Sequence, residues 1–122
     1  MDFTERLELY QEGGMINADD VKDVLAVVDM FKEKYGIQLC EENADTFVAH
    51  LCAAFGRNAT GEAVEPLMEE AFAEVKALDT YPLAVEMLES IKGVIHNTLN
   101  QTEQAYVLLH LNNLLEKLKG EA

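Results

Sequence analysis

Two histidines in this sequence each have polar partners at helical spacings. Arg57 follows His50 by seven residues, and Glu103 and Tyr106 precede His110 by seven and four. Because a helix turns about 100° per residue, these partners lie on the same side of a helix as their histidine. The first pattern therefore supplies an imidazole and a cation, and the second supplies a carboxylate, a phenol and an imidazole. Imidazole titrates near neutral pH, so these are the main candidates for chemistry.

A carboxylate beside His110 is expected to raise the pKa of its imidazole and to fix its tautomer. The third histidine, His96, has no matching partner pattern. It stands near a predicted helix end, where a partly charged ring is favoured by the helix dipole, so it is interpreted as an ordinary boundary residue.

No metal and no other cofactor is predicted. Neither helix that carries the paired histidines has a His-x-x-x-His or Glu-x-x-His ligand pair. Cys40 and Cys52 are twelve residues apart, which matches no common zinc signature, and both are interpreted as reduced packing residues. A small enzyme or metal-binding bundle that uses His50, His110 and Glu103 remains an alternative.

The elements that position these residues are predicted to be helices, since no segment shows a convincing strand pattern. Asn17 is expected to cap a helix over 18–35, which Gly36 ends. Apolar periodicity predicts four further helices over 41–57, 63–77, 81–95 and 101–119. The fold class is therefore all-α, a compact five-helix bundle over 17–122, and residues 1–16 form an N-terminal extension or a short helix.

The helix predicted over 41–57 lacks a polar face in its second half. Opposite its apolar stripe stand only the small residues Ala49, Ala53 and Gly56. A helix of this kind is generally buried on several sides. We expect either a central place in the bundle or a subunit contact through this face.

Composition narrows the classes of function. The 122 residues carry a formal charge of −14 and are 49% hydrophobic, which suits one folded domain. This charge repels nucleic-acid phosphates and anionic lipid, and no apolar run approaches the roughly 20 residues of a membrane span. We expect a cytoplasmic protein without direct nucleic-acid or membrane binding.

Two stretches together resemble the PRD family, the phosphotransferase-system regulation domains. Residues 47–57, with His50 and Arg57, resemble the first histidine motif of the family, and residues 103–111, with Glu103, Tyr106 and His110, resemble the second. Tyr81-Pro82 is similar to the aromatic-proline start of a helix between them. The resemblance covers about residues 21–118.

The resemblance implies a five-helix regulatory module, usually a homodimer and not an enzyme. It implies that His50 and His110 accept phosphoryl groups from the histidine phosphocarrier protein or a sugar-specific transport subunit. Arg57 would orient the phosphoryl oxygens, and Glu103 and Tyr106 would position His110. The module would act alone on transcription or on a partner protein of a sugar-utilisation operon. The alternative is an adaptor bundle with vestigial histidines.

Overall fold

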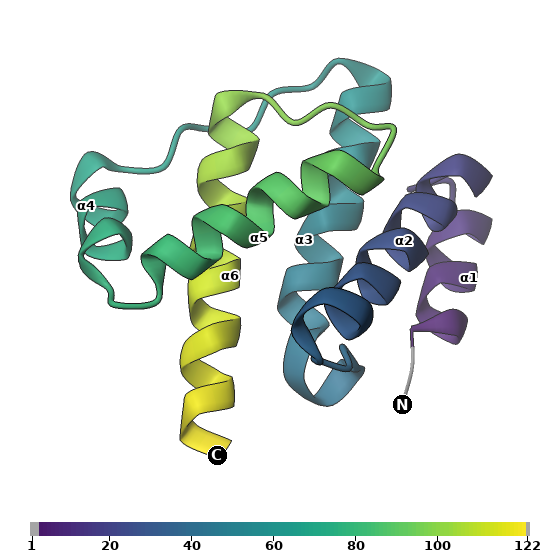
Figure 1. The fold of residues 1–122 in the computed structure, drawn as a ribbon. Helices are drawn as coiled ribbons and strands as arrows, with labels where there is room; N and C mark the ends of the chain where they lie inside the picture. Colours follow the sequence, from purple (N-terminus) through teal and green to yellow (C-terminus); the bar gives the residue numbers. More distant parts are fainter. Residues whose placement is uncertain (1–2, 122) are drawn as a thin grey trace.

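Six α-helices make up residues 3–121, the part of the chain that the computed structural model describes (Figure 1). They are α1 (Thr4–Glu12), α2 (Ala18–Tyr35), α3 (Glu41–Thr60), α4 (Glu69–Ala77), α5 (Tyr81–Val94) and α6 (Gln101–Glu121). No strand occurs within this range, which confirms the all-α class. The expected number of five helices is wrong by one. The segment before Asn17 folds as α1, because Phe3 and Leu7 are buried in the common core.

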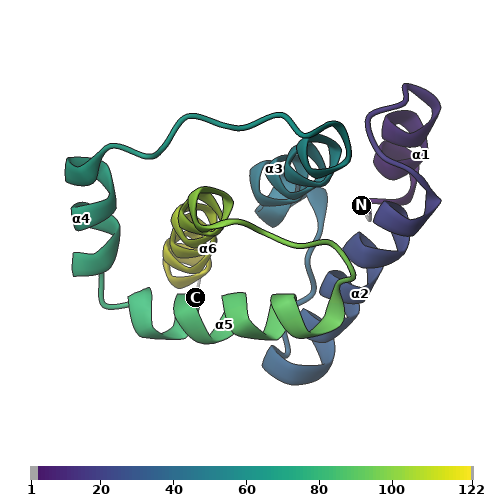
Figure 2. The same ribbon diagram turned by 90° about the horizontal axis from the view of Figure 1, so that it is seen from above.

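The two longest helices, α3 and α6, lie side by side and run in opposite directions at the centre of the molecule (Figures 1 and 2). Contacts between the two helices join Arg57 to Glu103 at one end and Glu42 to Lys117 at the other. Around this pair, α5 crosses one side. Helix α2 packs against α3 and α5, and α1 packs against α2. On the other flank, α4 packs against α5 and α6.

The apolar stripes predicted for the two central helices are buried. In α3 the buried residues include Ala44, Phe47, Val48, Leu51, Cys52 and Phe55. In α6 they include Val107, Leu108, Leu111, Leu114 and Leu115. Burial raises the pKa of the Cys52 thiol to about 12, so it remains a protonated packing group. Burial of apolar faces from both helices is what keeps α3 and α6 together.

The cap of α2 confirms the expectation for Asn17. Its side chain accepts a hydrogen bond from the Asp20 amide at 2.9 Å, and the Asp20 carboxylate accepts one from the Asn17 amide at 3.1 Å. The helix ends at Gly36, which adopts the left-handed conformation with φ 67°. Both predicted limits of this helix are therefore correct.

The helix expected over 63–77 is shorter than predicted, since α4 begins at Glu69. Residues 62–68 form no helix, and Pro66 lies in this connection and not in a first helical turn. Proline disfavours helical backbone in the residue before it, and the carbonyl of that residue, Glu65, instead accepts a hydrogen bond from the Tyr106 hydroxyl. In contrast, α3 continues three residues beyond its predicted end.

The small-residue face of α3 is only partly buried. Ala49, Ala53 and Gly56 are all half-buried. Gly56 lies against the turn between α1 and α2, where a Cβ atom would stand 2.8 Å from the Met15 carbonyl oxygen. The small residue therefore permits a close approach of this turn to α3.

Replacing Gly56 by alanine is expected to destabilise the fold by about 1–3 kcal/mol, because a new methyl group meets backbone that cannot turn aside. Gly93 in α5 is the matched control, since nothing lies within 4 Å of its Cβ position. There, Gly93→Ala is expected to stabilise by about 0.5–1 kcal/mol. Urea unfolding of both variants checks this, and equal effects would contradict the close contact at Gly56.

Candidate functional site

The two histidines that sequence spacing singled out meet where α3 faces α6. The ring centroids of His50 and His110 are 4.6 Å apart. The ring of Tyr106 stacks on His50 at 5.4 Å, with 28° between the planes. Residues 60 positions apart in the chain thus form one cluster. We call this contact region between α3 and α6 the histidine seam, and it comprises His50, Tyr106 and His110.

A buried ion pair closes one end of the histidine seam. The Arg57 guanidinium donates from Nε and Nη2 to the two Glu103 carboxylate oxygens at 2.7 and 2.8 Å. The Glu103 side chain is only 6% exposed, so its charge depends on this two-point contact. The Asn100 side chain caps α6, because its oxygen accepts a hydrogen bond from the Glu103 amide at 2.8 Å.

Glu103 and Tyr106 contact His50, although they share a helix with His110. The Nε2 atom of His50 lies 3.7 Å from a Glu103 oxygen, too far for a hydrogen bond. This Nε2 is buried and has no hydrogen-bond partner among the described residues. Burial and the charge of Arg57 lower the pKa of His50, and Glu103 opposes them only in part.

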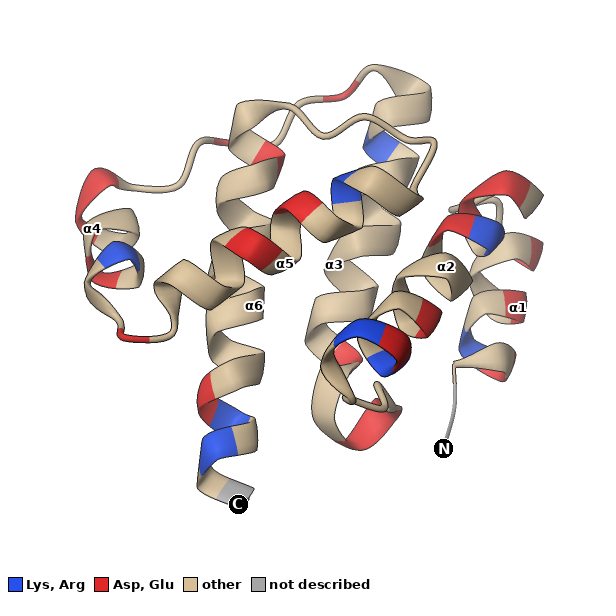
Figure 3. Cartoon of the chain, in the orientation of Figure 1, with Lys and Arg blue, Asp and Glu red and all other residues tan. Residues whose placement is uncertain are grey.

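The interior of the histidine seam carries no charged side chain. Between Thr46 and Gly56 in α3, and between Gln104 and Leu115 in α6, there is no Asp, Glu, Lys or Arg, although such residues cover most other helices (Figure 3). Burial, with a smaller contribution from His50, lowers the pKa of His110 to about 4. A rise in this pKa was expected from the Glu103 carboxylate, and that expectation is wrong. Burial dominates, and the carboxylate instead forms its hydrogen bonds with Arg57 of α3.

Two cavities open at opposite ends of the histidine seam. One of about 300 Å³ is lined by His110 together with the first turns of α3 and the last turns of α6. The other, of about 210 Å³, is lined by Arg57, Glu103 and the connections that follow α3 and precede α6. His110 can therefore be reached from outside, whereas the Nε2 atom of His50 is covered.

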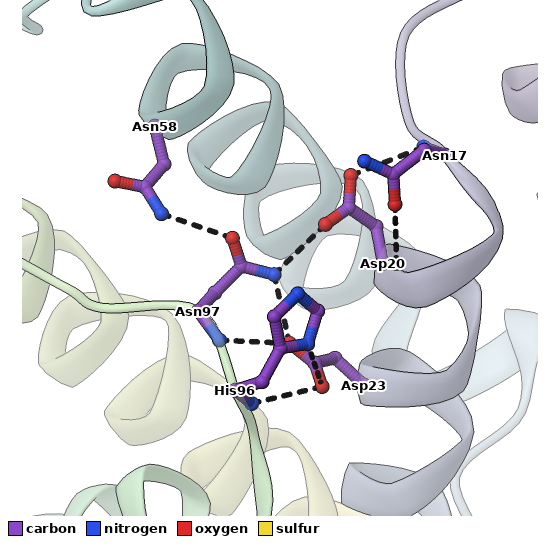
Figure 4. A network of polar contacts seen from close by, with 6 residues as sticks. All are labelled: Asn17, Asp20, Asp23, Asn58, His96 and Asn97. Atoms are coloured by element: carbon purple, nitrogen blue, oxygen red, sulfur yellow. Dashed lines mark hydrogen bonds and ion pairs between the residues drawn. The ribbon is translucent and has the colours of Figure 1, made fainter.

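A polar network fixes the connection between α5 and α6 and so sets where α6 begins (Figure 4). The Asn97 side chain donates to Asp20 at 2.8 Å and to Asp23 at 2.7 Å, and its oxygen accepts a hydrogen bond from Asn58. Both carboxylates are almost completely buried. The network joins α2, the α5–α6 connection and the end of α3, next to Arg57.

His96 belongs to this network and not to the histidine seam. Its ring Nδ1 lies 2.8 Å from Asp23, a residue 73 positions away. The hydrogen bond to Asp23 raises the pKa of the exposed His96 ring. Burial acts to raise the pKa of Asp23, but the hydrogen bonds from His96 and Asn97 outweigh burial. The pKa of Asp23 is therefore below its usual value. Sequence spacing could not indicate this pair, because Asp23 lies in α2 and His96 lies in the connection between α5 and α6.

The comparisons with known proteins concern most of the chain. The family model of the PRD domain matches residues 25–114. Over 109 residues the chain is 27% identical to the "Uncharacterized protein YhfY" of Escherichia coli (strain K12), covering 89% of this chain and 91% of that protein. No solved structure matches.

None of the helices within 3–121 is both long and apolar enough to traverse a lipid bilayer. Within the same range, no three His, Cys, Asp or Glu side chains gather so that they could hold a metal ion.

Arg57→Ala is expected to destabilise the fold by about 3 kcal/mol, because it leaves the buried Glu103 carboxylate without its partner. The double variant Arg57→Met with Glu103→Leu should recover most of this loss. The exposed Lys119–Asp79 pair is the control, and its removal should cost less than about 1 kcal/mol. Urea unfolding measures all three, and a cost for Arg57→Ala as small as the control's would contradict a buried pair.

Acid is expected to destabilise the fold through His110. Its pKa in the folded protein, about 4, lies below the roughly 6.5 of an unfolded histidine. The unfolded state therefore binds the proton first, and stability that is present above pH 6.5 falls as the pH approaches 4. The loss through this ring stays below about 3 kcal/mol at pH 4, because solvent screens part of the effect at a partly exposed ring. NMR titration and urea unfolding of wild type and His110→Gln test this, and a His110 midpoint near 6.5 would refute it.

Proposed function

Because this chain belongs to the PRD family, we propose that it is a regulatory protein, not an enzyme, that accepts phosphoryl groups on His50 and His110. The donors in this proposal are the histidine phosphocarrier protein or a sugar-specific subunit of a phosphotransferase system. The observation that carries it is the direct contact of the two imidazoles, 4.6 Å apart, beside the Arg57–Glu103 pair. Neither motif alone would provide this arrangement.

The electrostatics of the histidine seam suit a phosphoryl acceptor. A pKa near 4 keeps His110 uncharged at neutral pH, so a ring nitrogen retains the lone pair that attacks phosphorus. In the transfer, this nitrogen forms a bond to the phosphorus of the donor's phosphohistidine as the donor's own P–N bond breaks. The electron pair of the broken bond stays with the donor imidazole, which takes up a proton as the His110 ring gives one up, and no water is consumed.

The two rings differ in access, which suggests an order of events. His110 lines the larger cavity, and a donor can approach it without any movement of the helices. The Nε2 atom of His50 is buried, so its modification requires that the ring turn or that α3 and α6 separate. Phosphorylation of His50 would therefore be linked to a change at the helix pair, which is what a regulatory protein needs.

A phosphoryl group would add nearly two negative charges to the contact between α3 and α6. On His50 it would repel Glu103, which lies within 4 Å, and attract Arg57, whose fork geometry suits phosphate as well as carboxylate. Arg57 would then exchange one anion for the other, and the contact between α3 and α6 would shift. In the proposed homodimer, this shift would change the population of two subunit arrangements.

The output in this proposal is control of transcription or of a partner protein of a sugar-utilisation operon. Direct binding to nucleic acid is not proposed, because the net charge of −14 opposes it. A cytoplasmic location belongs to the same proposal, since the acceptor must meet its phosphorylated donor.

One observation favours an alternative. The Nε2 atom of His50 is buried and finds no hydrogen-bond partner within residues 3–121. A ring that serves only to fill space between α3 and α6 would show the same feature. The alternative is therefore an adaptor bundle whose histidines no longer accept phosphoryl groups.

Incubation with phosphoenolpyruvate, the first enzyme of the transport system and its phosphocarrier is expected to give acid-labile phosphate on the wild-type protein. His110→Gln should lose most of the label, and the double variant with His50→Gln all of it. His96→Gln is the control and should be labelled like the wild type, since His96 lies outside the histidine seam. An unlabelled wild type with every cognate donor, or a labelled double variant, would contradict the proposal.

A further inference from the structure

The cavity beside His110 is lined by a positively charged side chain, that of Lys117, which belongs to neither sequence motif. From α6, the cavity is lined by His110, Asn113 and Lys117, and from the first turns of α3 by Asn43, Asp45 and Thr46. Lys117 follows His110 by seven residues, which is the spacing of Arg57 after His50. Each of the two helices thus carries an imidazole and, two turns later on the same side, a positive charge.

Lys117 lines the same cavity as His110, two turns further along α6. Side chains of a helix lean toward its N-terminus, so Lys117 leans along α6 in the direction of His110. Its Nζ atom now donates to the backbone carbonyl oxygen of Glu42, at 2.5 Å, across the mouth of the cavity. Among the described residues no carboxylate forms an ion pair with this ammonium group. A carbonyl oxygen is a weaker partner than an anion, so an anion in the cavity would displace it.

The carboxylates at the cavity are already paired with another residue. Glu41 and Asp45 both form ion pairs with Arg6 of α1, the first at 3.8 Å. The cavity lined by His110 therefore combines an ammonium group that has no carboxylate partner among the described residues with two carboxylates that share Arg6.

We infer that Lys117 is the positioning residue that binds the phosphoryl group on His110, as Arg57 is placed to do for His50. This inference rests on the proposed function, because it concerns a phosphoryl group carried by His110. On phosphorylation, Lys117 moves its hydrogen bond from the Glu42 carbonyl to a phosphoryl oxygen. The last turns of α6 then lose a contact with the start of α3, at the opposite end of the histidine seam from Arg57.

The test uses the full chain and phosphoramidate, which transfers its phosphoryl group to imidazole and releases ammonia without any protein donor. At a fixed ratio of phosphoramidate to ammonia, mass spectrometry gives the ratio of phosphorylated to free His110. Lys117→Gln is expected to lower this ratio about three- to tenfold, the net effect of one solvent-accessible hydrogen bond. Lys117→Arg should restore it, because arginine keeps the charge.

Lys119→Gln is the matched control, since Lys119 stands on the same helix and pairs with the exposed Asp79. It should leave the ratio at the wild-type value. A ratio that Lys117→Gln does not change would overturn the inference, whereas labelling of wild-type His110 would still support the proposed function. Loss of labelling from the phosphocarrier alone, with phosphoramidate unaffected, would make Lys117 a donor-docking residue and also overturn the inference. No phosphate on His110 of the wild type from either source would overturn both.

Discussion

The ion pair of Arg57 with Glu103 is the interaction on which the arrangement of this protein depends. It joins the last turns of α3 to the first turn of α6 through two hydrogen bonds, and the carboxylate is almost wholly withdrawn from water. A buried pair of this geometry tolerates little displacement, since either charge alone would be costly in the interior. It therefore fixes the register of the two antiparallel helices. With that register set, His50 and His110 must face each other two turns further along.

The same pair explains why the ring environment is so weakly charged. The Glu103 carboxylate lies 3.7 Å from the His50 Nε2 atom, but its side-chain hydrogen bonds go to Arg57 and to neither ring. Both rings therefore remain neutral bases in a low-dielectric contact between helices. A neutral, uncharged interface is the environment in which an added charge has its largest effect, because little solvent or counter-charge is present to screen it. The stability of the unmodified state and its sensitivity to modification have one physical origin.

The sequence predicted those features that follow from one helix at a time. The stripe from Ala44 to Phe55 and the cap at Asn17 were correctly predicted, because both depend on spacing within a segment. The spacing of Glu103, Tyr106 and His110 also predicted that they share one side of a helix. It could not show that Glu103 bonds across to α3, since a partner on another helix leaves no periodic pattern. The helix expected over 63–77 was predicted too long for a similar reason, since the hydrogen bond from the Tyr106 hydroxyl to the Glu65 carbonyl comes from a distant helix.

The Asn97 side chain links the segment before α6 to two other helices. Its hydrogen bonds hold two nearly buried carboxylates of α2 on one side and the Asn58 amide of α3 on the other. The start of α6 is therefore anchored to both neighbours at once, and it cannot slide without pulling on α2. The turn before α2 in its turn rests on Gly56. A continuous set of contacts thus connects the segment before α6 with the outer layer formed by α1 and α2.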